Sequence, residues 1–120
     1  MKHYTTIEQS KKLLKLGLNS ESADMHYLDG KPGILSYQEA MSVKSKYIHS
    51  GVDVMPCWSL EALLEAIPQE NCTWALREEK SIDIQLPNEE EKWTGICDSY
   101  LDAAYNIVVW LLENDYIKKN

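Results

Sequence analysis

The strongest apolar pattern in the chain lies between residues 100 and 113. Large aliphatic residues and alanine fill most of this stretch, and only Asp102, Asn106 and Glu113 mark a narrow polar strip. Ser99 stands in the position of a helix cap. A helix that is apolar around most of its circumference is normally buried. We therefore predict a helix over 100–113 that lies across a sheet or partly in a subunit contact.

Three further segments carry helical spacing. Residues 59–67 place leucine or isoleucine at positions 60, 63, 64 and 67, and Pro68 follows as a stop. Overlapping capping boxes at residues 5–9 predict a second helix, which should end at Gly17 because glycine accepts the left-handed cap conformation. A weaker pattern predicts a third helix between residues 36 and 50.

The alternating segments predict strands. Residues 81–86 alternate between aliphatic and polar side chains, and residues 73–77 precede them, so we predict an antiparallel hairpin with one wet face. Residues 25–28 indicate another short strand. We expect residues 87–92 to form a charged loop and 93–97 to form a third strand next to the hairpin.

These elements together predict the α+β class, with a small, mainly antiparallel sheet and helices near both ends of the chain. The pairs Asp29-Gly30 and Pro32-Gly33 indicate a turn after the first strand. No linker or repeat interrupts the pattern, and 120 residues is a single-domain length. We therefore expect one domain over 1–120.

Charge is distributed unequally along the chain. The formal net charge is −7, and residues 61–120 hold thirteen acidic side chains against four lysines and one arginine. This acidic half disfavours direct contact with nucleic acid or with an anionic membrane surface, because both need a positive field. The longest apolar run has six residues, at 107–112, which is too short to span a membrane. With no apolar leader pattern and an odd number of cysteines, we expect a cytoplasmic protein.

Little in the chain suggests catalysis. No phosphate-binding loop, metalloprotease or nucleophile-elbow motif is present, which favours a non-enzymatic protein. Cys57, Cys72 and Cys97 lack the paired spacing of zinc ligands, so we expect no metal and no cofactor. We expect Cys57 to be a small buried residue, as free cysteines usually are. Cys57 also precedes a predicted helix cap by two residues, so the alternative is a thiol whose pKa the helix N-terminus lowers. A small thiol-dependent or redox-sensitive protein that uses Cys57 is therefore an alternative hypothesis.

Trp93 and the acidic run before it are the candidate binding residues. Trp93 follows Glu89, Glu90, Glu91 and Lys92, and an aromatic side chain beside charge on a loop is a common interface anchor. The alternative is a tryptophan that merely closes the sheet edge. We interpret the protein as an accessory protein that binds another macromolecule, with an unidentified protein as the expected partner. A further alternative is an acidic mimic of nucleic acid that blocks a DNA-binding protein through its carboxylates.

Several strings stand out in the chain, namely Pro-Cys-Trp-Ser-Leu-x-Ala-Leu-Leu at 56–64, Trp-Leu-Leu-Glu-Asn-x-Tyr-Ile at 110–117, and the segments 6–10, 16–19 and 23–25. Together they resemble a group of short bacterial proteins associated with gut anaerobes, their phages and mobile elements. The resemblance covers about half of the chain and implies a small intracellular α+β protein, compatible with a gene carried on a mobile element. No activity is known for that group, so the resemblance assigns no role to any residue.

Overall fold

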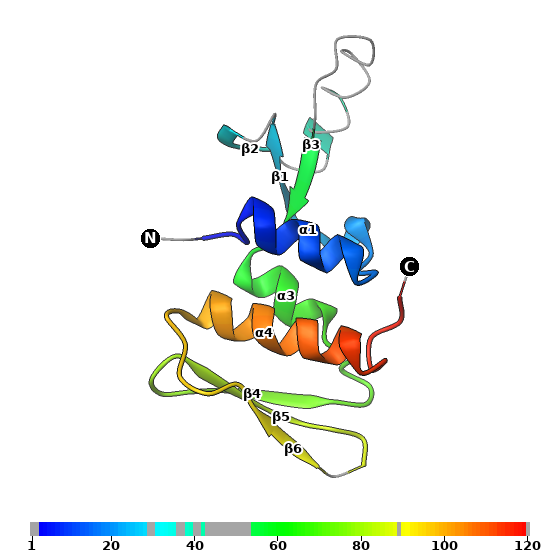
Figure 1. Ribbon diagram of the computed structural model, residues 1–120, viewed down its shortest axis with the longest axis vertical. Helices are drawn as coiled ribbons and strands as arrows, with labels where there is room; N and C mark the ends of the chain where they lie inside the picture. The colour runs from blue at the N-terminus through cyan, green and yellow to red at the C-terminus, as the bar shows by residue number, and fades with distance from the viewer. Residues whose placement is uncertain are drawn as a thin grey trace.

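The computed structural model describes residues 3–28, 31–35, 38–39, 42, 54–88 and 90–119. The elements form two separate three-stranded antiparallel sheets, ordered β2-β1-β3 and β4-β5-β6. Figure 1 shows the helices in the middle of an elongated molecule, with one sheet at each end. The predicted α+β class, with helices near both ends, is confirmed. The elements are α1 (Ile7–Lys15), the 3-10 turn η1 (Ser20–Ser22), β1 (Met25–Leu28), β2 (Lys31–Leu35), β3 (Val54–Cys57), α3 (Leu60–Ala66), β4 (Thr73–Arg77), β5 (Ser81–Gln85), β6 (Glu91–Trp93) and α4 (Tyr100–Glu113).

The expectation of a single sheet is wrong. Pro32 and Gly33 were expected in a turn or loop but belong to β2, and no strand was expected at β3. Pro32, Gly33 and Pro56 disguise these strands, because proline and glycine normally interrupt a sheet. Both strands lie at the edges of their sheet, where a missing N–H group need not break the ladder. The predicted helix over 36–50 falls almost wholly outside the described residues.

Helix α1 begins and ends as its sequence indicates. The hydroxyl of Thr6 accepts a hydrogen bond from the N–H of Gln9, and the Gln9 side chain accepts one from the N–H of Thr6. At the other end, Gly17 has a φ of +102°. The N–H groups of Gly17 and Leu18 donate to the carbonyls of Leu14 and Leu13, which completes a Schellman motif.

Helices α3 and α4 form the centre of the core. The hydroxyls of Ser59 and Ser99 cap them, each accepting from the N–H three residues later. Helix α4 packs against α3 on one side and against β5 on another. Eight of its fourteen residues are buried. Its unusual apolar circumference therefore reflects burial between two layers of the same chain.

A network of hydrogen bonds centred on Thr5 joins the first sheet to α1. Thr5 is fully buried, and its N–H donates to the carbonyl of Trp58 at 2.8 Å. Its hydroxyl accepts from the N–H of Trp58 at 3.0 Å and bonds with the hydroxyl of Ser10 at 2.8 Å. The hydroxyl of Tyr27, on β1, donates to the Thr5 carbonyl at 2.9 Å. One side chain and its backbone thus hold together three segments that lie far apart in the sequence.

Candidate binding surface

The register of the second sheet sorts its side chains onto two faces. Ile82 and Ile84 of β5 are buried on the inner face, which packs against α4. Asp83 points to the opposite side because successive side chains of a strand alternate. Trp93 lies directly across from Asp83, and Ala75 of β4 lies across from it on the other flank. The predicted hairpin and its one wet face are confirmed, and we call the wet side the outer face.

Trp93 lies at the end of a strand and remains exposed. The third strand was expected over 93–97, but β6 is Glu91–Trp93, so the last residues of the expected loop belong to the sheet. The Trp93 side chain keeps 56% of its surface accessible. Glu90 and Glu91 are exposed beside it, whereas Glu89 lies outside the described residues. The sheet therefore holds Trp93 in a fixed position on its outer face.

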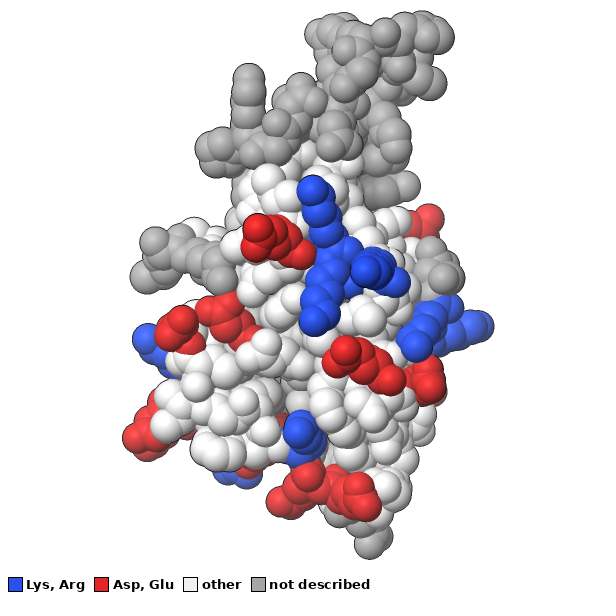
Figure 2. All heavy atoms as spheres, viewed as in Figure 1, with Lys and Arg blue, Asp and Glu red and all other residues white. Residues whose placement is uncertain are grey.

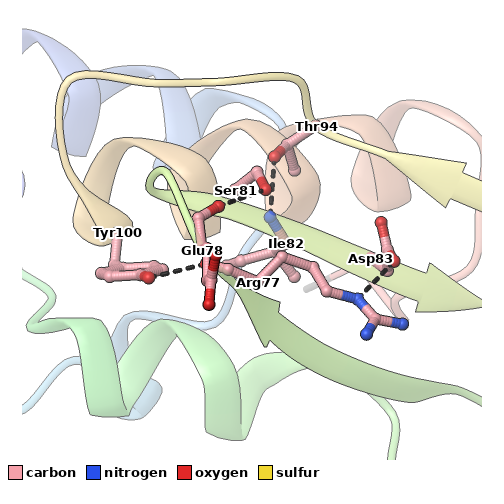
Figure 3. Close-up of polar contacts among 7 residues, drawn as sticks. All are labelled: Arg77, Glu78, Ser81, Ile82, Asp83, Thr94 and Tyr100. Carbon is pink, nitrogen blue, oxygen red and sulfur yellow. Dashed lines mark hydrogen bonds and ion pairs between the residues drawn. The ribbon is translucent and has the colours of Figure 1, made fainter.

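Hydrogen bonds link the strands of the outer face to one another and to neighbouring elements (Figure 3). The guanidinium of Arg77 donates from Nε to a carboxylate oxygen of Asp83 at 2.6 Å, which joins β4 to β5. The hydroxyl of Tyr100, on α4, donates to the carbonyl of Arg77 at 2.6 Å. Thr94 continues the pairing with β5 beyond Trp93, because its hydroxyl accepts from the N–H of Ile82. These contacts hold the outer face in place against α4 and the loop that follows β6.

The turn between β4 and β5 carries Glu78 and Glu79, which add two carboxylates to the outer face. Glu79 and Lys80 adopt φ values of +63° and +58°, a left-handed conformation that costs a non-glycine residue about 1–2 kcal/mol. The Cys97 N–H donates to the Lys80 carbonyl, and the Ser81 hydroxyl donates to the Glu78 carbonyl, so neighbouring groups hold the turn in place. Such strain persists where the surroundings enforce it, often at functional sites.

Two shallow hollows mark the outer face. The larger has a volume of about 730 Å³ and lies between Trp93 and the turn that carries Glu78 and Glu79. The smaller, of about 130 Å³, extends toward Glu91. Arg77 and Asp83 line both hollows, so the ion pair separates them.

Charge is distributed unequally between α1 and the elements on the side of the second sheet. Lys11, Lys12 and Lys15 are exposed on α1, and Figure 2 shows basic side chains gathered over that helix. Acidic side chains dominate the part of the same view that holds α3, α4 and the second sheet. The sequence-level charge asymmetry thus becomes a separation in space.

The burial expected for Cys57 is confirmed, and the alternative of a lowered pKa is contradicted. Cys57 is fully buried on β3, and burial raises the pKa of its thiol to about 12, with the nearby Asp24 carboxylate as a second cause. The capping group of α3 is Ser59, whose hydroxyl and N–H both bond with Asp24. The N-terminus of α3 is thus capped by the Ser59 hydroxyl and not by the Cys57 sulfur, and the thiol stays neutral. This environment suits a buried structural cysteine, not a thiolate nucleophile.

The other possible sites are less developed. A hollow of about 670 Å³ lies at the start of α4, lined in part by Leu60, Lys80 and Tyr100. Cys97 is half-buried beside Asn106 and Gly95, and Cys72 is buried. Among the described residues, no group of three or more histidine, cysteine or acidic side chains is placed to hold a metal ion.

The comparisons with known proteins give no information about the site. No family model, no curated protein and no solved structure matches this chain. None of the helices in the described ranges combines the length and the apolar character needed to cross a membrane.

Sequence reasoning found part of the outer face and missed the rest. It selected Trp93, Glu90 and Glu91, which the structure brings to one edge of the second sheet. It missed Arg77 and Asp83, although the alternation of β5 already placed Asp83 on the polar side. The missing information was the register of β6, which sets Trp93 opposite Asp83.

Proposed function

We propose that this protein acts without catalysis, by binding another protein through the outer face of the β4-β5-β6 sheet. The observation that carries the proposal is the exposure of Trp93, at 56%, on a strand that is paired along its length. A large aromatic side chain held on a rigid support gives a partner much contact area with little loss of conformational entropy.

The surroundings of Trp93 support this role. The hydroxyl of Tyr100 donates to the sheet and that of Thr94 accepts from it, which fixes the sheet against α4 and the following loop, so the surface is formed before a partner arrives. Preorganisation of this kind reduces the entropy that association must overcome. The charged side chains around Trp93 form the polar rim that interfaces usually have.

Affinity capture with matched variants tests the proposal. The wild-type chain, Trp93→Ala and Ile96→Ala are immobilised, and proteins retained from a lysate are compared by quantitative mass spectrometry. Ile96 is 65% exposed and lines a different hollow, with Gln9 and Asn106, so its truncation controls for the loss of any exposed apolar group. We expect a protein retained by wild type and Ile96→Ala but lost from Trp93→Ala.

Circular dichroism and urea unfolding of the same preparations show whether Trp93→Ala keeps its fold. A folded Trp93→Ala that retains every protein captured by the wild type would contradict the proposal.

A further inference from the structure

The outer face carries more negative charge than it can neutralise. Glu78, Glu79 and Glu91 are exposed around the two hollows, and Asp83 lies between them. Arg77 is the basic residue that lines these hollows, and it is already paired with Asp83. In the described part of the chain, none of the three glutamates has an ion-pair partner.

The two lysines nearest in sequence are directed elsewhere. Lys92 belongs to β6, but its ammonium lies over the Trp110 ring of α4, 5.4 Å from the ring centroid, on the inner side of the sheet. Lys80 lines the separate hollow at the start of α4. Neither lysine therefore forms an ion pair with Glu78, Glu79 or Glu91 in the described part of the chain.

Trp93 adds a second kind of attraction for a cation. Trp93 is exposed and lines the larger hollow, which Glu78 and Glu79 also line. An aromatic face attracts an ammonium or, more often, a guanidinium group within about 6 Å of its centroid. A basic side chain in this hollow would meet the ring on one side and carboxylates on the other.

We propose that the partner presents an extended segment rich in arginine or lysine to the outer face, with a basic side chain between Trp93 and the β4–β5 turn. This inference rests on the proposed function and names the chemistry of the partner. Nucleic acid is disfavoured at this face because its phosphates would meet carboxylates. A second copy is disfavoured in a symmetric arrangement, because two faces of the same negative sign would meet.

Peptide titration tests the charge requirement. The probe is a fluorescent peptide of about twelve residues that alternates arginine and serine, and the control probe alternates glutamate and serine. Binding is measured by anisotropy with wild type, with Glu78→Gln/Glu79→Gln/Glu91→Gln, and with Glu61→Gln/Glu65→Gln/Glu70→Gln. The second triple variant removes the same charge from exposed positions on α3 and the turn after it, away from the outer face.

We expect the outer-face triple variant to weaken binding of the arginine peptide about tenfold or more, and the α3 variant to weaken it less than about threefold. Trp93→Ala should also weaken binding, because it removes the aromatic contact. Arg77→Gln should strengthen binding, because it removes the competing guanidinium and releases Asp83. Equal losses in both triple variants would overturn the inference, since they would indicate attraction by net charge alone.

The two proposals fail in different ways. A captured protein that depends on Trp93 but is not displaced by the arginine peptide would leave the proposed function intact and overturn the basic-segment inference. Displacement of that protein by the arginine peptide, and not by the glutamate peptide, supports the inference. Analytical ultracentrifugation of the chain alone tests for self-association. A concentration-dependent dimer that is lost in the outer-face triple variant would assign the face to a second copy and overturn the inference.

Discussion

The two sheets of this protein are attached to the helices by different forces. The first sheet is joined to α1 through hydrogen bonds that converge on Thr5, with Tyr27 and Trp58 as partners. The second sheet is joined to α4 through an apolar face, where Ile82 and Ile84 are almost fully buried. Hydrogen bonds specify orientation, whereas apolar burial supplies most of the stability.

The difference also decides where a partner can bind. An alternating strand that buries one face must present the other, so the second sheet gains its stability on the inner face and keeps the outer face available. Stability and recognition are thus assigned to opposite sides of the same three strands. The predictions below test this division.

The largest expected effect is on the inner face of the second sheet. Ile84→Ala should lower the free energy of unfolding by about 2–5 kcal/mol, because it leaves a cavity between β5 and α4. Urea denaturation monitored by far-UV circular dichroism measures the loss, with Ile96→Ala as the exposed control. A change below about 1 kcal/mol would mean that this face is not core.

The next effect concerns the first sheet. Thr5→Val keeps the shape of the side chain but removes the hydroxyl that accepts from the Trp58 N–H and bonds with Ser10. We expect a loss of about 1–3 kcal/mol, because buried polar groups are left without a partner. Thr73→Val, at an exposed position of β4, serves as the control in the same urea series. Equal stabilities of Thr5→Val and wild type would show that the hydrogen bonds of the Thr5 hydroxyl do not hold the first sheet against α1.

A smaller effect should appear at alkaline pH through Cys57. Its pKa is about 12 in the folded protein, above the ordinary value of 9.0, so the unfolded chain releases this proton first. The contribution of this group is therefore complete below pH 9 and is lost as the pH rises from 9 toward 12. Comparing the unfolding free energy of wild type and Cys57→Ala at pH 8 and pH 10 should give the steeper decline for wild type. Parallel declines would contradict the raised pKa.

The smallest effect on stability should come from the outer face. Trp93→Ala removes a large side chain that is more than half exposed, and surface substitutions of this kind usually change stability by less than about 0.5 kcal/mol. Urea midpoints equal to those of wild type, together with lost capture of the partner, would confirm the division between the two faces. A loss comparable to that of Ile84→Ala would place Trp93 in the core and remove the basis of the proposed site.

The sequence predicted those elements whose signals are local. The capping serines and threonines, Gly17 and the alternation of β5 placed α1, α3, α4 and the β4–β5 hairpin close to their observed bounds. The signals at β2 and β3 were misleading, because Pro32 and Pro56 are tolerated only on account of the edge positions of these strands. An edge position is a property of the assembled sheet and is not visible in a single segment.

The candidate site shows the same limit. Trp93 and its acidic neighbours could be selected from the sequence, but their exposure could not. The roles of Arg77 and Asp83 depend on pairing between strands, and the neutral state of Cys57 depends on burial by distant segments. Chemistry that arises from long-range contacts therefore becomes visible only with the fold.

The position of α4 after the second sheet has a consequence for synthesis on the ribosome. The last strand of that sheet ends at Trp93, while the helix that covers its inner face is complete only at Glu113. At about 5–20 residues per second, residues 94–113 take roughly 1–4 s to synthesise after the last strand, so the sheet is always made before its cover. Ile82 and Ile84 can therefore be buried only after α4 has followed the sheet out of the ribosome, and folding of this sheet waits for the last helix.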